Sequence, residues 1–324
     1  MSISKILVTG GAGFIASNLI DRLLALNYHV VVVDDLRSGN IENLSPKARF
    51  YKTDMATKDL DLIFTAEQPD LVYHYAAQIS VQSSMVDPIR DADNNIKGSL
   101  NVLNNCVKNN VKKVIYTSSG GAIYGEPSYL PCDESHSVQP LSHYGVSKFA
   151  VENYLHVFRT IHSLDYTVLR LSNVYGPRQD PYGEAGVIAI FAKAMLSGQP
   201  VTINGTGDQE RDFIYIQDVV DASIAAIDAG SAQSFNVGTG VGSSINTVFT
   251  LLKAASGYEL QPTYSEAKPG EVFKIYLNAD KAKRYLNWEP RFTLKQGLHA
   301  VSYTHLRAHE PLRYLVCRLL LEKK

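Results

Sequence analysis

A glycine-rich turn near the N-terminus constrains the fold of this chain more than any other feature. The run Thr9-Gly10-Gly11-Ala12-Gly13-Phe14-Ile15-Ala16 follows a short apolar segment and opens a segment with helical periodicity. A strand, such a turn and a helix form the first unit of a dinucleotide-binding fold, where the glycines let backbone N–H groups approach a pyrophosphate. The predicted cofactor contacts here are Gly10, Gly13, Phe14 and Ile15.

Strand and helix patterns alternate through the first half of the chain. Apolar or β-branched runs at 5–9, 29–33, 48–51, 70–74, 113–117 and 166–171 predict strands. The segment 87–109 predicts one long helix, and Ser142 is a candidate N-cap for another, ending near Thr160. The predicted class is therefore α/β: a Rossmann-type doubly wound parallel sheet over residues 1–173. A smaller α/β substrate-binding lobe is expected mainly from 174–300, where turn signals multiply.

Acidic and small residues follow the later strands, where they would meet a bound dinucleotide. Asp34 ends the second strand, at the spacing of the carboxylate that binds the adenosine ribose. A carboxylate there repels a 2′-phosphate, which favours NAD over NADP as the cofactor. Asp54 follows the third strand, either near the adenine or as ordinary loop chemistry. Ala76 and Ala77 follow the fourth, where small residues admit the cofactor or simply pack.

A tyrosine and a lysine four residues apart form the candidate catalytic pair. Tyr144 and Lys148 lie on one face of the predicted helix. A neighbouring cation favours the phenolate, so we expect Lys148 and the positive nicotinamide to lower the pKa of Tyr144. Tyr144 would then exchange a proton with a substrate hydroxyl near neutral pH.

Ordered motifs from residue 3 to about 298 give the chain a family resemblance. It resembles the extended short-chain dehydrogenases/reductases of the NAD-dependent epimerase/dehydratase family, most closely the nucleotide-sugar 4-epimerases of the UDP-glucose type. Besides the turn and the Tyr-Lys pair, the matching segments are 33–36, 73–78, 87–88, 95–98, 116–125, 170–178, 211–213 and 218–219.

The resemblance implies further site residues and a partner. Asp35, Asn95 and Ser118 would contact NAD, with Tyr144 and Lys148. Asn173, Arg211 and Lys268 would hold the diphosphate of a nucleotide sugar, although the family often has arginine at the last position. A homodimer through paired helices is the family expectation, and no metal is expected.

The catalytic serine departs from the family pattern. The family's Ser or Thr lies four residues before the tyrosine of a Tyr-Gly pair, here Tyr124, and that position is Gly120. We expect Ser119, shifted by one residue, to bind the sugar hydroxyl and act in catalysis, with Ser118 as the alternative.

The residues between the serines and Tyr124 bear on the reaction. Sugar dehydratases and decarboxylases of this family carry an acidic residue there, whereas residues 120–123 are Gly, Gly, Ala and Ile. The chain keeps the Tyr-Lys pair and the NAD site needed to oxidise the sugar, but it lacks the acidic residue needed to eliminate water. This combination favours NAD-dependent epimerisation at C4 through a transient 4-keto sugar. A dehydratase or decarboxylase of the same family, or a non-catalytic NAD-binding protein, are the alternatives.

Bulk composition excludes several other classes. The formal net charge of −1 and the absence of a basic stripe argue against nucleic-acid binding. No signal peptide or apolar run long enough for a bilayer is visible, so no membrane partner is expected. The 3 cysteines suggest no disulfide framework, and a cytoplasmic location is expected.

The C-terminal segment 301–324 does not resemble the family. Residues 301–310 and 315–324 look like one reading frame of a sequencing-library adapter, apart from Pro311, where that frame would give Thr. We interpret the segment as non-native read-through and exclude it from the functional argument.

Overall fold

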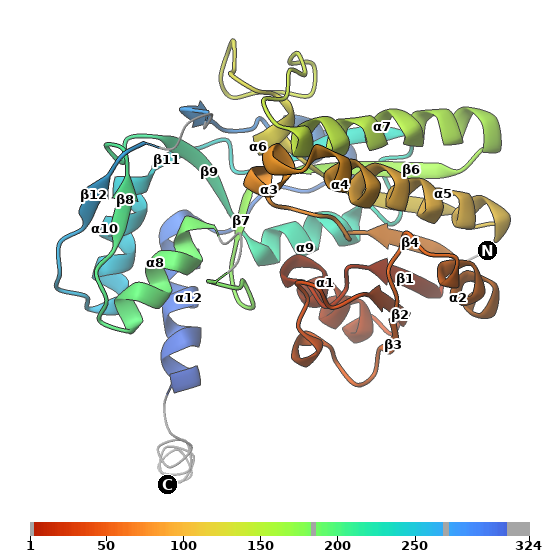
Figure 1. Cartoon of the computed structure of the whole chain (residues 1–324), viewed down its shortest axis with the longest axis horizontal. Helices are drawn as coiled ribbons and strands as arrows, with labels where there is room; N and C mark the ends of the chain where they lie inside the picture. The colour runs from red at the N-terminus through yellow and green to blue at the C-terminus, as the bar shows by residue number, and fades with distance from the viewer. Residues whose placement is uncertain (1–2, 183–185, 268–271, 310–324) are drawn as a thin grey trace, which may run out of the picture.

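A seven-stranded parallel sheet organises the larger part of the molecule (Figure 1). This computed structural model describes residues 3–182, 186–267 and 272–309. The strand order reverses between β1 and β4, with later strands added outward on both sides, as in doubly wound folds. In sheet order the strands are β10 (Gln233–Val237), β6 (Asp165–Leu171), β5 (Lys113–Ser119), β4 (Leu71–His74), β1 (Lys5–Thr9), β2 (His29–Asp34) and β3 (Arg49–Lys52).

Helices cover both faces of this sheet, which explains why its strands are almost continuously apolar. Along β1, Ile6 and Val8 pack with one apolar cluster and Leu7 packs with another, because successive side chains point to opposite faces. The first cluster lies under α1 (Phe14–Ala25) and α9 (Ile216–Ala225). The second lies under α2 (Asp59–Glu67), α5 (Gly98–Lys108) and α7 (His143–His162).

The predicted single helix over 87–109 is wrong in detail. Short helices α3 (Val81–Val86) and α4 (Pro88–Ala92) lead into a π-helical turn, η2 (Asp93–Lys97), before α5 begins. Asp87 caps α4 by accepting a hydrogen bond from the backbone N–H of Arg90 at 2.9 Å, and so starts a new helix. A π-turn is often found beside a functional site, and this one carries Asn95.

The second lobe lies to one side of the large sheet (Figure 1). A small sheet is built around β9, and a second small sheet joins β8 to β12. Three helices pack together beside them around a separate apolar cluster. The lobe comprises β7 (Asn173–Tyr175), α8 (Val187–Leu196), β8 (Thr202–Asn204), β9 (Glu210–Tyr215), β11 (Gly242–Ser244), α10 (Ile245–Ser256), β12 (Thr263–Ser265), β13 (Lys274–Ile275) and α12 (Leu294–His309). The remaining elements are η1 (Ile41–Asn43), α6 (Gly120–Ile123) and α11 (Asp280–Leu286).

Two segments beyond the predicted boundary at residue 173 lie with the large sheet. Strand β10 pairs with β6 from Gln233 to Val237, and α9 packs on α1. The chain therefore leaves the large sheet after β6 and later returns to complete it. A single boundary in the sequence cannot describe this discontinuous arrangement. Every helix in the described ranges is too short or too polar to span a bilayer.

Candidate functional site

A cleft of about 1460 Å³ runs along the carboxyl ends of the central strands. In open parallel sheets, ligands bind at this edge, where the strand order reverses. The turn after β1, the loops after β2 and β4, and the end of β5 all contribute to the wall. The second lobe adds residues from β7 and β9, so one continuous cleft joins the glycine-rich turn to Tyr144 and Asn173.

Gly10 explains why the first turn needs glycine. Its φ of +69° lies in the left-handed region, and a Cβ there would lie 2.7 Å from backbone atoms of Ala76. The turn after β1 and the loop after β4 are therefore in direct backbone contact. Phe14 and Ile15 begin α1 at the cleft wall, where the first N–H groups of a helix lack intrahelical acceptors. The turn thus presents a helix N-terminus to the cleft, a geometry that suits an anion, and pyrophosphate binding there stays a prediction.

Asp34 lies at the end of β2 and lines the cleft. Its carboxylate accepts hydrogen bonds from the backbone N–H groups of Ala12 at 3.0 Å and Leu36 at 2.8 Å. Burial raises the pKa of Asp34 above its ordinary value of 3.8, and these two bonds act in the opposite direction. The side chain is therefore fixed in place at the ribose position predicted from the sequence.

Asp54 does not line the cleft and is connected to it only through another side chain. Its Oδ2 accepts an ion-paired hydrogen bond from Arg37 at 3.0 Å, and Arg37 itself lines the cleft. Asp35 also lines the cleft and pairs with Arg37. Sequence reasoning missed Arg37, although a cation three residues after Asp34 was a visible signal.

The loop after β4 is held by Asn95 from below the cleft wall. Ala76 and Ala77 line the cleft as predicted. Asn95 is buried outside the lining, with Oδ1 accepting from the Gln78 N–H at 2.7 Å and Nδ2 donating to the Gln78 carbonyl at 2.9 Å. The predicted cofactor contact by Asn95 is therefore not seen in this geometry. Asn95 positions the loop that carries the two alanines.

Tyr144 and Lys148 project from α7 into the cleft. Ser142 caps this helix by accepting a hydrogen bond from the N–H of Gly145 at 3.1 Å, as the sequence predicts. Ser119, at the end of β5, is the hydroxyl-bearing neighbour that acts to lower the pKa of Tyr144. Helix α7 and strand β5 thereby place a phenol, a serine hydroxyl and an amine in one region.

Gly120 cannot supply the family's hydroxyl. A Cβ at this position would lie 2.4 Å from the Leu277 side chain. A serine there would therefore displace the buried Leu277. The hydroxyl that acts on the pKa of Tyr144 belongs to Ser119, which favours Ser119 over Ser118.

Burial shifts the pKa of Tyr144 in the direction opposite to the one expected from the sequence. It raises the pKa of Tyr144 to about 12, while the hydrogen bond from Ser119 acts in the opposite direction. Burial likewise lowers the pKa of Lys148 to about 7, against the opposing influence of Glu152 and Asp91. The prediction that Lys148 lowers the tyrosine pKa is therefore wrong for the protein alone, because the cost of burying each charge is larger.

Two buried serine hydroxyls suit a polar ligand at the inner part of the cleft. Among the described residues, the Oγ atoms of Ser118 and Ser172 are buried without a hydrogen-bond partner, and both residues line the cleft. A buried hydroxyl without a partner is costly, and an amide-bearing ring would satisfy it. Together with the close Gly10–Ala76 contact and the fixed Asp34 carboxylate, these hydroxyls fit a dinucleotide such as NAD.

The three predicted substrate-binding residues differ in their position relative to the cleft. Asn173, on β7, is exposed and lines the cleft. Arg211, on β9, donates to the carbonyls of Glu210 at 2.9 Å and Phe273 at 3.3 Å and is not among the lining residues. Lys268 lies outside the described residues.

The fold and the site define a Rossmann-type, dinucleotide-dependent enzyme with a Tyr-Lys pair. Residues 6–238 match the NAD dependent epimerase/dehydratase family. This match spans most of the chain, and the chain belongs to that family. NAD is accordingly its cofactor.

Relatives with known names are similar over nearly the whole chain. The UDP-glucose 4-epimerase of Mycolicibacterium smegmatis is 42% identical over 300 residues, covering 91% of this chain and 96% of the relative. The solved structure of Thermotoga maritima UDP-glucose 4-epimerase with UDP-glucose matches with a TM-score of 0.93 and 46% identity, covering 94% of this chain and 100% of the other. The UDP-glucose 4-epimerase of Thermus thermophilus, solved in complex with NAD, matches with a TM-score of 0.88 and 37% identity, covering 94% and 99%.

Proposed function

We propose that this protein is a nucleotide-sugar 4-epimerase that retains NAD and interconverts UDP-linked sugars of the glucose and galactose type. The observation that carries the proposal is that Tyr144, Ser119 and Lys148 line the same cleft as the glycine-rich turn. A dinucleotide site alone is compatible with many activities. A proton-exchanging phenol beside it specifies oxidation of an alcohol.

NAD, when bound, would supply a reversible hydride acceptor for the sugar C4, and its positive nicotinamide would favour the phenolate of Tyr144. Tyr144 takes the proton from the C4 hydroxyl and gives it back after the hydride returns. Ser119 donates a hydrogen bond to the same sugar oxygen and holds it as it becomes a ketone. Inversion at C4 would require the hydride to return to the opposite face of the 4-keto sugar.

The segment between Ser119 and Tyr124 supports epimerisation over elimination. Residues 120–123 form α6 and contain no acidic side chain. Gly120 is packed against Leu277, so an acid cannot be accommodated there without displacing the core. A dehydratase would need a proton donor for the departing hydroxyl, and α6 supplies none.

The UDP group is inferred from the relatives named for UDP-glucose. On the sugar-nucleotide side of the cleft, Asn173 and Phe213 from the second lobe face residues of the large sheet. We propose that Asn173 contacts the diphosphate, together with Arg211 and Lys268. In this proposal Arg211 moves toward the nucleotide when it binds.

We also propose a homodimer and a cytoplasmic location. Helix α7 exposes an apolar stripe at Val146, Tyr154, Val157 and Ile161, with spacings of one or two helical turns. Helices α3 and α4 pack beside α7 and add exposed Val86 and Ile89. Such a patch is typical of a protein interface. Cys106 and Cys132 are buried free thiols, which suits a reducing compartment.

A panel of UDP-sugars tests the proposed function. The purified protein is incubated without added cofactor with UDP-glucose, UDP-galactose, UDP-N-acetylglucosamine, UDP-glucuronate and a UDP-pentose, and the products are separated. Interconversion of at least one C4 pair, without net NADH formation, is expected. Release of a dehydrated or decarboxylated sugar, or no turnover of any member by protein that holds NAD, would contradict the proposal.

A further inference from the structure

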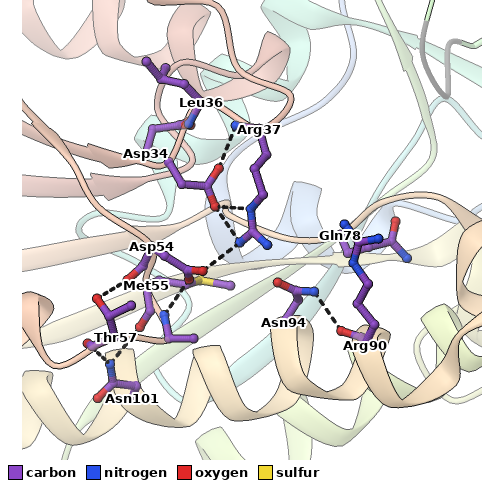
Figure 2. A network of polar contacts seen from close by, with 12 residues as sticks. Asp34, Leu36, Arg37, Asp54, Met55, Thr57, Gln78, Arg90, Asn94 and Asn101 are labelled. Carbon is purple, nitrogen blue, oxygen red and sulfur yellow. Dashed lines mark hydrogen bonds and ion pairs between the residues drawn. The ribbon is translucent and has the colours of Figure 1, made fainter.

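Arg37 lies between two acidic side chains at the adenosine end of the cleft. Its Nε donates to Asp35 Oδ2 at 2.6 Å, and its Nη2 donates to Asp54 Oδ2 at 3.0 Å. Figure 2 shows the guanidinium reaching from the loop after β2 toward Asp54, in the loop after β3. The Arg37 side chain is 49% exposed and lines the cleft. A cation faces the dinucleotide site, but its donors are directed at the protein's own carboxylates.

The loop that carries Arg37 is folded tightly over Asp34. Leu36 has a φ of +63°, an unfavourable conformation for a leucine, and this conformation directs its N–H to Asp34 Oδ1. A Cβ at Gly39 would lie 2.8 Å from Ala12 Cβ and 2.9 Å from Asp34 Oδ1. The loop therefore has little freedom, and it keeps Arg37 within a few residues of the predicted ribose carboxylate.

Asp54 is presented to Arg37 by a fixed turn. The other carboxylate oxygen of Asp54 accepts from the Ala56 N–H at 2.8 Å. Asn101, on α5, donates to the carbonyls of Met55 at 2.7 Å and Thr57 at 2.9 Å, as Figure 2 shows. The turn is thus tied to a helix of the large domain, and Asp54 is a preorganised acceptor rather than a mobile surface acid.

A free arginine at this place would favour the wrong dinucleotide. NADP differs from NAD by a phosphate on the adenosine 2′-oxygen, and guanidinium groups bind phosphate through two parallel hydrogen bonds. We propose that Asp35 and Asp54 withhold Arg37 from a 2′-phosphate, so that selectivity for NAD depends on this carboxylate clamp as well as on Asp34. This inference rests on the dinucleotide site proposed above.

Binding measurements with charge-neutral variants test the clamp. Dissociation constants for NAD and NADP are measured by titration calorimetry on protein freed of nucleotide. The double variant Asp35→Asn/Asp54→Asn keeps the shape of both side chains and removes both charges. We expect the ratio of NADP to NAD affinity to rise about tenfold or more, the scale of one charge-assisted hydrogen bond.

The triple variant that adds Arg37→Gln separates the clamp from simple repulsion. Removing two negative charges favours a phosphate even without an arginine, so the triple variant measures that contribution alone. Most of the gain in NADP affinity should disappear in the triple variant. The single variant Asp54→Asn, which leaves one partner for Arg37, should show an intermediate gain.

The outcomes distinguish the clamp from the site on which it depends. Failure of the wild-type protein to bind either dinucleotide would overturn the proposed site and the clamp together. Tight NAD binding with an unchanged NADP to NAD ratio in the double variant would overturn the clamp alone. An equal gain in the double and triple variants would also overturn it, because repulsion would then account for the whole effect.

Discussion

The Ser147 hydroxyl donates a 2.6 Å hydrogen bond to the Asp91 carboxylate, which joins helix α7 to the short helix α4. Asp91 also accepts from Gln78 Nε2 at 3.0 Å and Asn95 Nδ2 at 2.9 Å. One buried carboxylate therefore fixes the position of α7, the loop after β4 and the π-turn. Ser147 stands between Tyr144 and Lys148 in the sequence, so this bond sets where both side chains project.

Removal of Asp91 should destabilise the protein and loosen its hold on NAD. Asp91→Ala leaves three donors, two of them on buried residues, without this acceptor, and we expect the free energy of unfolding to fall by about 3 kcal/mol. Urea unfolding with and without NAD measures this loss. Ser147→Ala is the matched control, because it removes one bond and should cost about 1 kcal/mol. Equal stability of Asp91→Ala and wild type would show that the carboxylate has no such role.

Separate alanine substitutions should identify the catalytic serine. Ser119 acts on the pKa of Tyr144, whereas the Ser118 Oγ is buried without a hydrogen-bond partner. Ser119→Ala should lower kcat by about two to three orders of magnitude, the range seen when a single oxyanion-type donor is removed. Ser118→Ala should affect NAD affinity more than kcat. Steady-state kinetics with the preferred UDP-sugar decide between them, and a larger kcat loss in Ser118→Ala would reverse the assignment.

A charge on the exposed stripe of α7 should separate the subunits. Ile161 is 67% exposed and belongs to the stripe with Val157. Ile161→Glu should give a monomer by sedimentation at concentrations where the wild type is a dimer. Leu62→Glu provides the control, because Leu62 is 72% exposed on α2, away from the stripe. A monomeric wild type, or a dimer unaffected by Ile161→Glu, would contradict the proposed interface.

Truncation after Val301 should leave folding and turnover intact. Helix α12 continues to His309, and Val301, the first residue of the segment 301–324 interpreted above as non-native, is buried in the cluster that contains Leu298. The non-native segment is therefore proposed to begin at residue 302 instead of 301. Thermal melting and turnover of the full chain and of the chain ending at Val301 provide the comparison. A clear loss of melting temperature or activity in the shorter chain would show that the segment belongs to the fold.

Local sequence patterns predicted the glycine-rich turn and helix α7, because both features depend on residues that are close in the sequence. The glycines of the first turn, the Ser142 cap and the spacing of Tyr144 and Lys148 each depend on neighbouring residues. The position of Asp34 could be predicted from the sequence for the same reason, since its distance from the turn is set by one strand–helix–strand unit.

The remaining features depend on contacts between distant segments. Leu277 excludes a side chain at Gly120, and β10 returns to pair with β6. The π-turn at Asn95 and the three bonds of Asp91 likewise join separate elements. The direction of the Tyr144 pKa was mistaken because burial is a property of the folded chain, and a four-residue spacing carries no information about it.

The comparison of Tyr144→Phe with wild type tests the central claim most directly. Phenylalanine keeps the ring and removes only the proton-exchanging oxygen, so NAD affinity should change little while kcat falls by about two to four orders of magnitude. Tyr285→Phe, at a tyrosine that is 55% exposed on α11, should retain wild-type turnover. Near-wild-type turnover by Tyr144→Phe, with NAD bound, would remove Tyr144 from the mechanism and contradict the account.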